Sequence, residues 1–322
     1  MRIKTLLEIL GLRRRSLRED FEHRIERQLT ALGRPSGLKI VLARWKRRRD
    51  FKKLTKRDAE FHVLHRGVAI SATWLSAVSV AILEDLASHG DEPEEKDETE
   101  ERAAPEKAVA LAFFSRLASD LWAIIDLVER GFDIQARGMA RTFLEHVDVL
   151  ICCIHDRELT ERFANAIEPD EANHFWHQHI SKNKMKRRVA ELVHSQIGLE
   201  GSDLVDSQRA PAELAGSSIL HPTMIAGMAA ALGSEDVDYE SYPIFPHPNI
   251  ASGGIFRVIL VHLFWLYLMM GPLPRSPHGA WDRLIENQTI RQNKMLRRLQ
   301  SINNDMHSFM LDWHVTMKPA DD

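Results

Sequence analysis

The sequence is poor in cysteine and lacks the short motifs of the common enzyme classes. Its two cysteines, Cys152 and Cys153, are adjacent, and neighbouring residues do not easily reach disulfide geometry. We expect two buried thiols in a reducing compartment. The chain has no glycine-rich phosphate loop, no Gly-x-Ser-x-Gly elbow, no paired Cys-x-x-Cys motifs and no His-Glu-x-x-His. The common nucleotide, hydrolase and zinc chemistries are therefore unsupported.

Long uninterrupted apolar runs are also missing. The stretch from Gly67 to Leu83 has 17 residues without a charge, and Val258 to Gly271 has 14. Both are shorter than the roughly 20 residues that a transmembrane helix needs, and four serine or threonine residues dilute the first. The opening segment does not resemble a secretory signal, because Glu8 interrupts its apolar stretch. We predict buried core helices, no membrane span and a cytoplasmic location.

Charge of each sign is concentrated in separate segments. The net charge is -3, but residues 1–57 carry 19 Lys and Arg against 6 Asp and Glu, and residues 88–107 carry 3 against 9. The acidic stretch has too few apolar residues to fold alone, so we expect a flexible linker. The chain then divides into a basic N-terminal helical section at 1–87, the acidic linker at 88–107 and a helical-bundle domain at 108–322.

Apolar periodicity predicts an all-α protein, a helical bundle with a basic N-terminal arm and a long C-terminal helix. No sustained alternation of apolar and polar residues predicts a strand. The main expected helices are residues 61–86, 106–130, 133–155, 168–194, 250–270 and 280–317. The last has a seven-residue apolar period with one polar layer. We expect it either to close the bundle or to pair with its copy in a homo-oligomer.

The basic arm contains the candidate nucleic-acid-binding residues. Lysine and arginine attract phosphate, and a tryptophan among them stacks on bases. The candidates are Arg44, Trp45, Lys46, Arg47, Arg48, Arg49, Lys52 and Lys53. We expect them to bind nucleic acid or another polyanion. The alternative is a solvated face that folds against the acidic linker.

The expected helix at 133–155 carries a narrow charged stripe. Asp133, Arg137, Arg141 and Glu145 follow one another at four-residue spacing, and apolar residues flank them. Ion pairs along the helix explain this pattern structurally. Partial burial of the same charges would instead indicate a site. His221 is a further candidate, because Pro222 places its imidazole near a helix start, where a structural role is the alternative.

Two short segments resemble a helical bacterial family known only as a domain of unknown function. They are Arg141-Thr-Phe-Leu-Glu145 and, some 75 residues later, Ser218-Ile-Leu-His221-Pro222. The resemblance covers about residues 108–231. It implies an all-α domain in which Arg141, Glu145 and His221 converge, and it implies no established activity.

The spacing from Arg141 to His146 is similar to the Arg-x4-6-His motif of the HEPN ribonucleases. Those proteins are helical and often belong to toxin or phage-defence systems. The resemblance implies that Arg141 stabilises a phosphate while His146 or His221 moves a proton. Five other Arg-His pairs in the chain have this spacing, so the pattern alone decides nothing.

Metal binding has weak support in the sequence. Two Glu-x-x-His matches fall on one expected helix, and His174, His177 and His179 lack a closed ligand set. We predict no metal and no other cofactor. Our leading hypothesis is a helical protein whose arm binds nucleic acid or another polyanion, in bacterial defence or stress response by analogy. The alternatives are an HEPN-like ribonuclease and an adaptor protein that dimerises through its last helix.

Overall fold

The structure, a computed structural model, describes residues 48–88, 98–181, 183–197, 248, 252–270, 280–285 and 293–316. Every regular element in these ranges is a helix, so the predicted all-α bundle is confirmed. A helix at residues 48–57 comes first. It is followed by α3 (Ala59–Ser88), α4 (Glu98–Glu129), α5 (Asp133–His155), α6 (Arg157–Asn165), α7 (Pro169–Phe175), the π-helix η1 (Trp176–Ile180), α8 (Lys184–Ile197), α11 (Gly253–Met270), α12 (Ala280–Leu284) and α14 (Lys294–Thr316).

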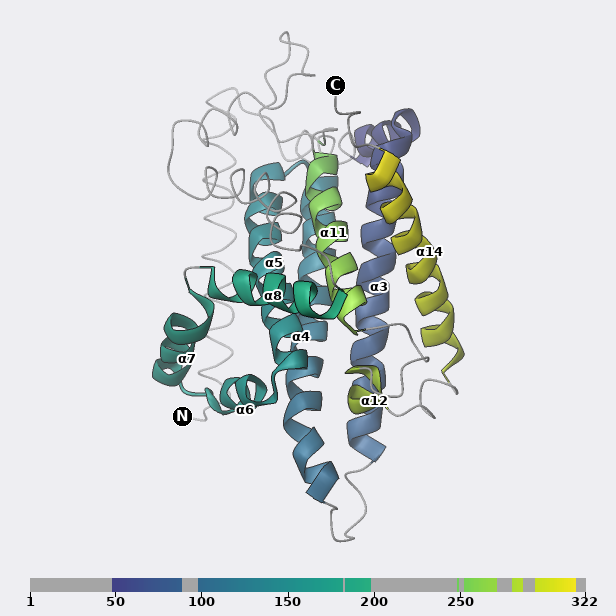
Figure 1. Cartoon of the computed structure of the whole chain (residues 1–322). Coiled ribbons are helices and arrows are strands. Elements are labelled where there is room, and N and C mark those ends of the chain that lie inside the picture. The colour runs from purple at the N-terminus through teal and green to yellow at the C-terminus, as the bar shows by residue number, and fades with distance from the viewer. Residues whose placement is uncertain are drawn as a thin grey trace, which may run out of the picture.

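Four long helices, α3, α4, α5 and α11, form the centre of the bundle (Figure 1). α3 packs against α4, α11 and α14, and α5 packs against α4, α8 and α11. Apolar side chains of all these helices join one hydrophobic core, which Phe51 of the helix at 48–57 also enters. Burial of this shared core supplies the main stabilising free energy of the bundle.

The turn between α4 and α5 follows the sequence prediction. Gly131 has a φ of 79°, which favours glycine, and its N–H bonds to the Val128 carbonyl at 2.9 Å. The Phe132 N–H bonds to the Leu127 carbonyl at 2.8 Å. These bonds end α4 and start α5 at once, so the two helices are antiparallel neighbours as expected.

The helix expected at 168–194 is interrupted in the structure. α7 passes into the π-turn of η1, and Asn183 then adopts a φ of 58° before α8 begins. A left-handed residue cannot continue a right-handed helix, so the chain turns there. α8 consequently crosses α5 instead of extending α7 (Figure 1).

The expected C-terminal helix is represented by α12 and α14. α14 packs against α3 within the same chain, which is the first of our two alternatives for it. Its inward residues include Leu296, Gln300 and Asn303, whereas Met295 and Ile302 of the predicted seam are 63% and 40% exposed. Trp281 and Ile285 of the seam are buried, and Leu299 and Met306 pack against the core. The seven-residue pattern is therefore confirmed at these positions and wrong at Met295 and Ile302.

The prediction of no membrane span is wrong, and with it the prediction of a cytoplasmic location is contradicted. Three helices are long and apolar enough to cross a membrane: Ala59–Ser88, Pro105–Glu129 and Gly253–Met270. In each, slightly more than half of the qualifying window is buried within the protein. By length and composition, these helices are compatible with a membrane protein.

The length of an uncharged run underestimates the length of an apolar helix, because such a helix can continue past a single charged residue. α3 has 30 residues and is about 45 Å long, more than the roughly 30 Å of a bilayer core. The hydroxyls of Thr73, Ser76 and Ser79 donate to carbonyls four residues earlier, at 2.8 to 2.9 Å, so they need no water. In α4, Arg116 and Asp120 pair with each other, which lowers the cost of two charges in an apolar helix.

Gly67 allows three helices to approach closely. A Cβ atom at this position of α3 would lie 3.0 Å from Met306 Sδ of α14 and 3.1 Å from Leu260 Cδ1 of α11. These distances are shorter than ordinary van der Waals contact, so the absence of a side chain sets the spacing of the crossing.

Polar residues of α14 lie against α3 and α11. The Trp74 Nε1–H donates to Gln300 Oε1 at 2.6 Å, and Tyr267 donates to Asn304. Asn303 is fully buried, and neither polar atom of its side chain has a hydrogen-bond partner in the part of the chain that the structure describes. A buried amide without partners destabilises the folded state.

We expect Asn303→Leu to raise the free energy of unfolding by about 1–3 kcal/mol, because leucine has a similar shape and removes the unpaired amide. Thermal and denaturant unfolding measure this change. Asn304→Leu is the matched control, since Asn304 accepts bonds from Gln300 and Tyr267 and its replacement should destabilise the protein. Equal destabilisation by both variants would contradict the interpretation.

His155 at the end of α5 lies in an environment that stabilises its neutral form. His155 Nε2–H donates to the Met269 carbonyl at 2.9 Å. Burial lowers the pKa of His155 below 6.5, and Arg283 lowers it further, against the opposing effect of the bond to Met269. The unfolded chain therefore binds a proton more readily than the folded one.

We expect stability to be complete above about pH 6.5 and to fall as the pH drops toward the lowered pKa of folded His155. The variant His155→Gln keeps a donor but cannot titrate, so it should lose part of this slope between pH 7 and pH 5. Urea unfolding at several pH values measures the slope. A variant with the same slope as the original chain would contradict the prediction.

Candidate functional site

The predicted residues Arg141, Glu145 and His146 lie on consecutive turns of α5. Arg141 Nε lies 3.5 Å from Glu145 Oε1, and these side chains are 38% and 53% exposed. These two side chains of the charged row are therefore more exposed than the apolar residues around them led us to expect. His221, Arg44, Trp45, Lys46 and Arg47 lie outside the described residues.

Asp133 and Arg137, the first two residues of the charged row on α5, form a second ion pair. Arg137 Nη2 lies 3.6 Å from Asp133 Oδ2, and both side chains are at most a quarter exposed. Ser252, just before α11, donates a hydrogen bond to the other oxygen of Asp133. This pair thus ties the start of α5 to the start of α11, which is a structural role.

His146 has a buried carboxylate partner on the neighbouring helix. Its Nδ1 lies 3.3 Å from Asp120 Oδ2, and the Asp120 side chain is only 7% exposed. Arg116, one turn earlier on α4, donates from Nε to both Asp120 oxygens at 3.0 and 3.1 Å. The Phe113 ring packs edge-on against the imidazole with centroids 6.2 Å apart. Two helices and one aromatic ring therefore fix the position of His146.

This geometry suits proton transfer at the surface of α4 and α5. A carboxylate on Nδ1 favours the tautomer with its proton there, which leaves the Nε2 lone pair as a base. His146 is 27% exposed and Arg116 is 60% exposed, so a ligand can reach both groups. The Arg116 terminal nitrogens form no hydrogen bond within the described residues, and guanidinium groups bind phosphate well.

Sequence reasoning missed Asp120 and Arg116. Their four-residue spacing on an apolar helix, next to Phe113, Leu117 and Leu121, was a usable signal of a charge pair held near the core. The partnership of Asp120 with His146 was not accessible in this way, because it depends on how α4 packs against α5.

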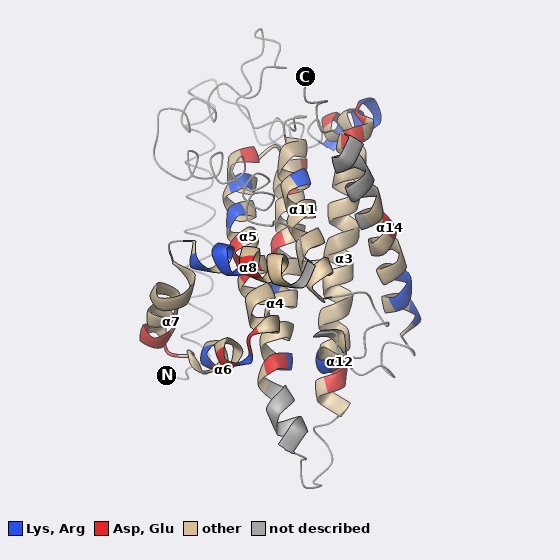
Figure 2. Ribbon diagram, viewed as in Figure 1, with Lys and Arg blue, Asp and Glu red and all other residues tan. Residues whose placement is uncertain are grey.

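The helix at 48–57 presents a one-sided cationic surface, which we call the cationic stripe. Phe51 is 8% exposed and packs against Phe61 and His65, with ring centroids 5.8 and 5.1 Å away. The opposite side carries six exposed basic residues: Arg48, Arg49, Lys52, Lys53, Lys56 and Arg57. Figure 2 shows the basic residues of this helix in blue, with acidic residues in red among them, beside the start of α3. Four of the eight predicted nucleic-acid-binding residues belong to the stripe.

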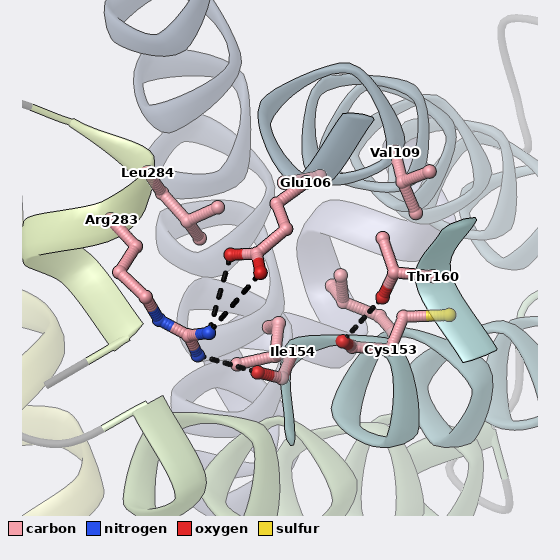
Figure 3. A pocket seen from close by; sticks show the side chains of 9 residues that line it. Glu106, Val109, Cys153, Ile154, Thr160, Arg283 and Leu284 are labelled. Atoms are coloured by element: carbon pink, nitrogen blue, oxygen red, sulfur yellow. Dashed lines mark hydrogen bonds and ion pairs between the residues drawn. The ribbon is translucent and has the colours of Figure 1, made fainter. Parts of the chain in front are cut away.

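A small pocket lies near the C-terminal end of α5, and the polar side chains that line it bond to one another or to nearby carbonyls (Figure 3). Arg283 donates to the Ile154 carbonyl at 2.6 Å and pairs with Glu106 at 3.2 Å, while Thr160 donates to the Cys153 carbonyl at 2.6 Å. Burial raises the pKa of the Cys153 thiol to about 12, so it is not a nucleophile near neutral pH. The pocket has a structural role.

Metal ligands do not gather in the described ranges. Within them, no three His, Cys, Asp or Glu side chains are arranged to hold an ion. His174 and His177 on α7 and η1 are exposed, and His179 packs against Phe175 at 4.8 Å.

Comparison with known proteins adds no relative to this description. No family model, no curated protein and no solved structure matches the chain. The resemblances to the family of unknown function and to the HEPN ribonucleases stay predictions.

Proposed function

We propose that the protein binds nucleic acid through the cationic stripe at 48–57. The observation that supports this proposal is the one-sided exposure of six basic side chains on a helix whose other side is docked in the core. Cations held on a fixed helix lose little freedom when they meet phosphates. Phosphate contacts then provide affinity that depends on salt and little on sequence.

This helix does not have the arrangement of a helix that inserts into a membrane interface. A helix that lies in a membrane interface inserts its apolar side among the lipids. Here the apolar side, Phe51 and Leu54, packs against the protein core instead. Only charge remains available, as in contacts to a phosphate backbone.

We expect the fourfold variant with Lys52, Lys53, Lys56 and Arg57 changed to Gln to bind a nucleic-acid duplex more weakly. The slope of log affinity against log salt should fall by about 0.9 for each phosphate that the variant no longer neutralises. Fluorescence anisotropy at several salt concentrations measures both quantities.

The matched control replaces four other exposed basic residues, Arg130, Lys294, Arg297 and Arg298, with Gln. It should bind almost as the original chain does. Unchanged duplex binding by the stripe variant, or a decrease in its binding to anionic vesicles alone, would overturn the proposal.

A second function is supported by the Asp120–His146 pair, namely cleavage of RNA at the surface of α4 and α5. His146 Nε2 would take the proton of a ribose 2′-hydroxyl, whose oxygen then bonds to phosphorus. The bond to the 5′-oxygen breaks, and the imidazolium returns the proton to that oxygen. Arg116 and Arg141, which pair with Asp120 and Glu145 on the same two helices, would neutralise charge on the phosphate oxygens. Such an activity would suit a defence or stress-response protein.

We expect His146→Ala to lower the rate of RNA cleavage by about 10²–10⁴-fold, because the proton-transfer group is removed. Asp120→Asn should also slow cleavage, since the amide disturbs the tautomer of His146. The measurement uses a labelled RNA, with a matched DNA that lacks the 2′-hydroxyl and should stay intact.

The control is His62→Ala. His62 is exposed and follows Arg57 at the same spacing as His146 follows Arg141. If cleavage survives in His146→Ala, or if DNA is cut as fast as RNA, this function is excluded.

A further inference from the structure

The turn formed by η1 and the start of α8 combines an exposed aromatic ring with concentrated positive charge. Trp176 is 45% exposed although it is among the largest apolar side chains of the protein. The segment from Ala172 to Ala190 contains five Lys and Arg, three His and no Asp or Glu. Figure 2 shows the blue start of α8 between α7 and α5.

This turn is held in one conformation by its own hydrogen bonds. Lys184 Nζ donates to the carbonyls of His177 and Gln178 at 2.9 and 2.7 Å, and Ser181 Oγ donates to the His177 carbonyl at 2.8 Å. The His177 ring packs edge-on against Trp176 with centroids 4.8 Å apart. A ring fixed in this way loses little freedom when it stacks on a ligand.

Positive charge at the turn extends to neighbouring helices. Burial lowers the pKa of His179, and the nearby cations Arg162 of α6 and Arg188 and Lys184 of α8 lower it further. Arg162 pairs with Glu158 and Arg188 pairs with Asp156, but both arginines stay at least 41% exposed. Arg187, with no ion pair in the described part of the chain, is exposed on α8 and precedes Arg188 in the sequence.

A chain of ring contacts joins this turn to the site at His146. His146 packs against Phe113, Phe113 against Phe163, Phe163 against Phe175 and Phe175 against His179, with centroid distances of 6.2, 5.1, 5.4 and 4.8 Å. The two surfaces are therefore connected through one packed aromatic row.

We infer that the turn of η1 and α8 binds single-stranded nucleic acid, with a base stacked on Trp176 and phosphates beside Arg187 and Arg188. Single-strand binding proteins combine these two features, a basic surface and an exposed aromatic ring. A duplex keeps its bases stacked inside and cannot offer one to Trp176. The inference rests on the proposed binding of nucleic acid, but it concerns a different surface and a different strand state.

The test measures binding of the full chain to an oligodeoxythymidine of about ten nucleotides and to a duplex of equal length. DNA is used because the proposed cleavage needs a 2′-hydroxyl. We expect Trp176→Leu to weaken single-strand binding by about five-fold or more and to leave duplex binding unchanged, while Trp176→Phe retains most of the affinity.

Trp122→Leu is the matched control. Trp122 on α4 is 46% exposed, almost as much as Trp176, but it lies one turn from Asp126 and has no cluster of cations in sequence around it. It should bind both probes as the original chain does. Equal single-strand affinity in Trp176→Leu and Trp122→Leu would overturn the inference, as would a decrease confined to anionic vesicles.

The same variant in the background of the fourfold stripe variant separates the two proposals. If only the inference is correct, the fourfold variant binds the duplex as the original chain does, and Trp176→Leu still lowers single-strand affinity in that background. If only the stripe binds nucleic acid, the fourfold variant loses both probes, and Trp176→Leu in the original chain changes neither.

Discussion

The burial of α3 on several sides constrains the rest of the structure. Every polar side chain along its buried part must find a partner inside the protein, because water does not reach it. Thr73, Ser76 and Ser79 solve this within the helix, through carbonyls of the preceding turn. Asp85 requires help from outside and obtains it from Lys107 of α4, at 2.6 Å. The pairing of α3 with α4 thus has an ionic contact as well as an apolar one.

Exposed charges lie on each of the long helices. α3 and α11 share the ion pair of Glu60 with Arg257, whose side chains are 45% and 49% exposed, and α4 and α5 carry Arg116, Asp126, Arg141 and Glu145 at least partly exposed. Any contact with lipid would favour the positions of α3 at which Val63 and Val80 are exposed.

Sequence reasoning succeeded where local periodicity decides the outcome. The range 133–155 was predicted for α5 because Gly131 ends one helix and an acidic residue opens the next, and the structure has the same bounds. It failed at 168–194, since a π-turn and the left-handed Asn183 leave no clear mark in composition. The apolar period of the last helix was real, but helix crossing decided that Gln300 and not Met295 is buried. Likewise, Arg141 and Glu145 were found from spacing, whereas Asp120 became visible only through its contact with His146.

Gly67 serves two helix crossings at once. The missing side chain leaves room for both α11 and α14 against α3, so any larger residue at this position would push against both neighbours together. The outer layer of short helices, α6 to α8, packs elsewhere, through the rings of Phe163 and Phe175 and through buried Met185, Val189 and Val193. The turn that carries Trp176 belongs to this outer layer and keeps the conformation that its own hydrogen bonds fix.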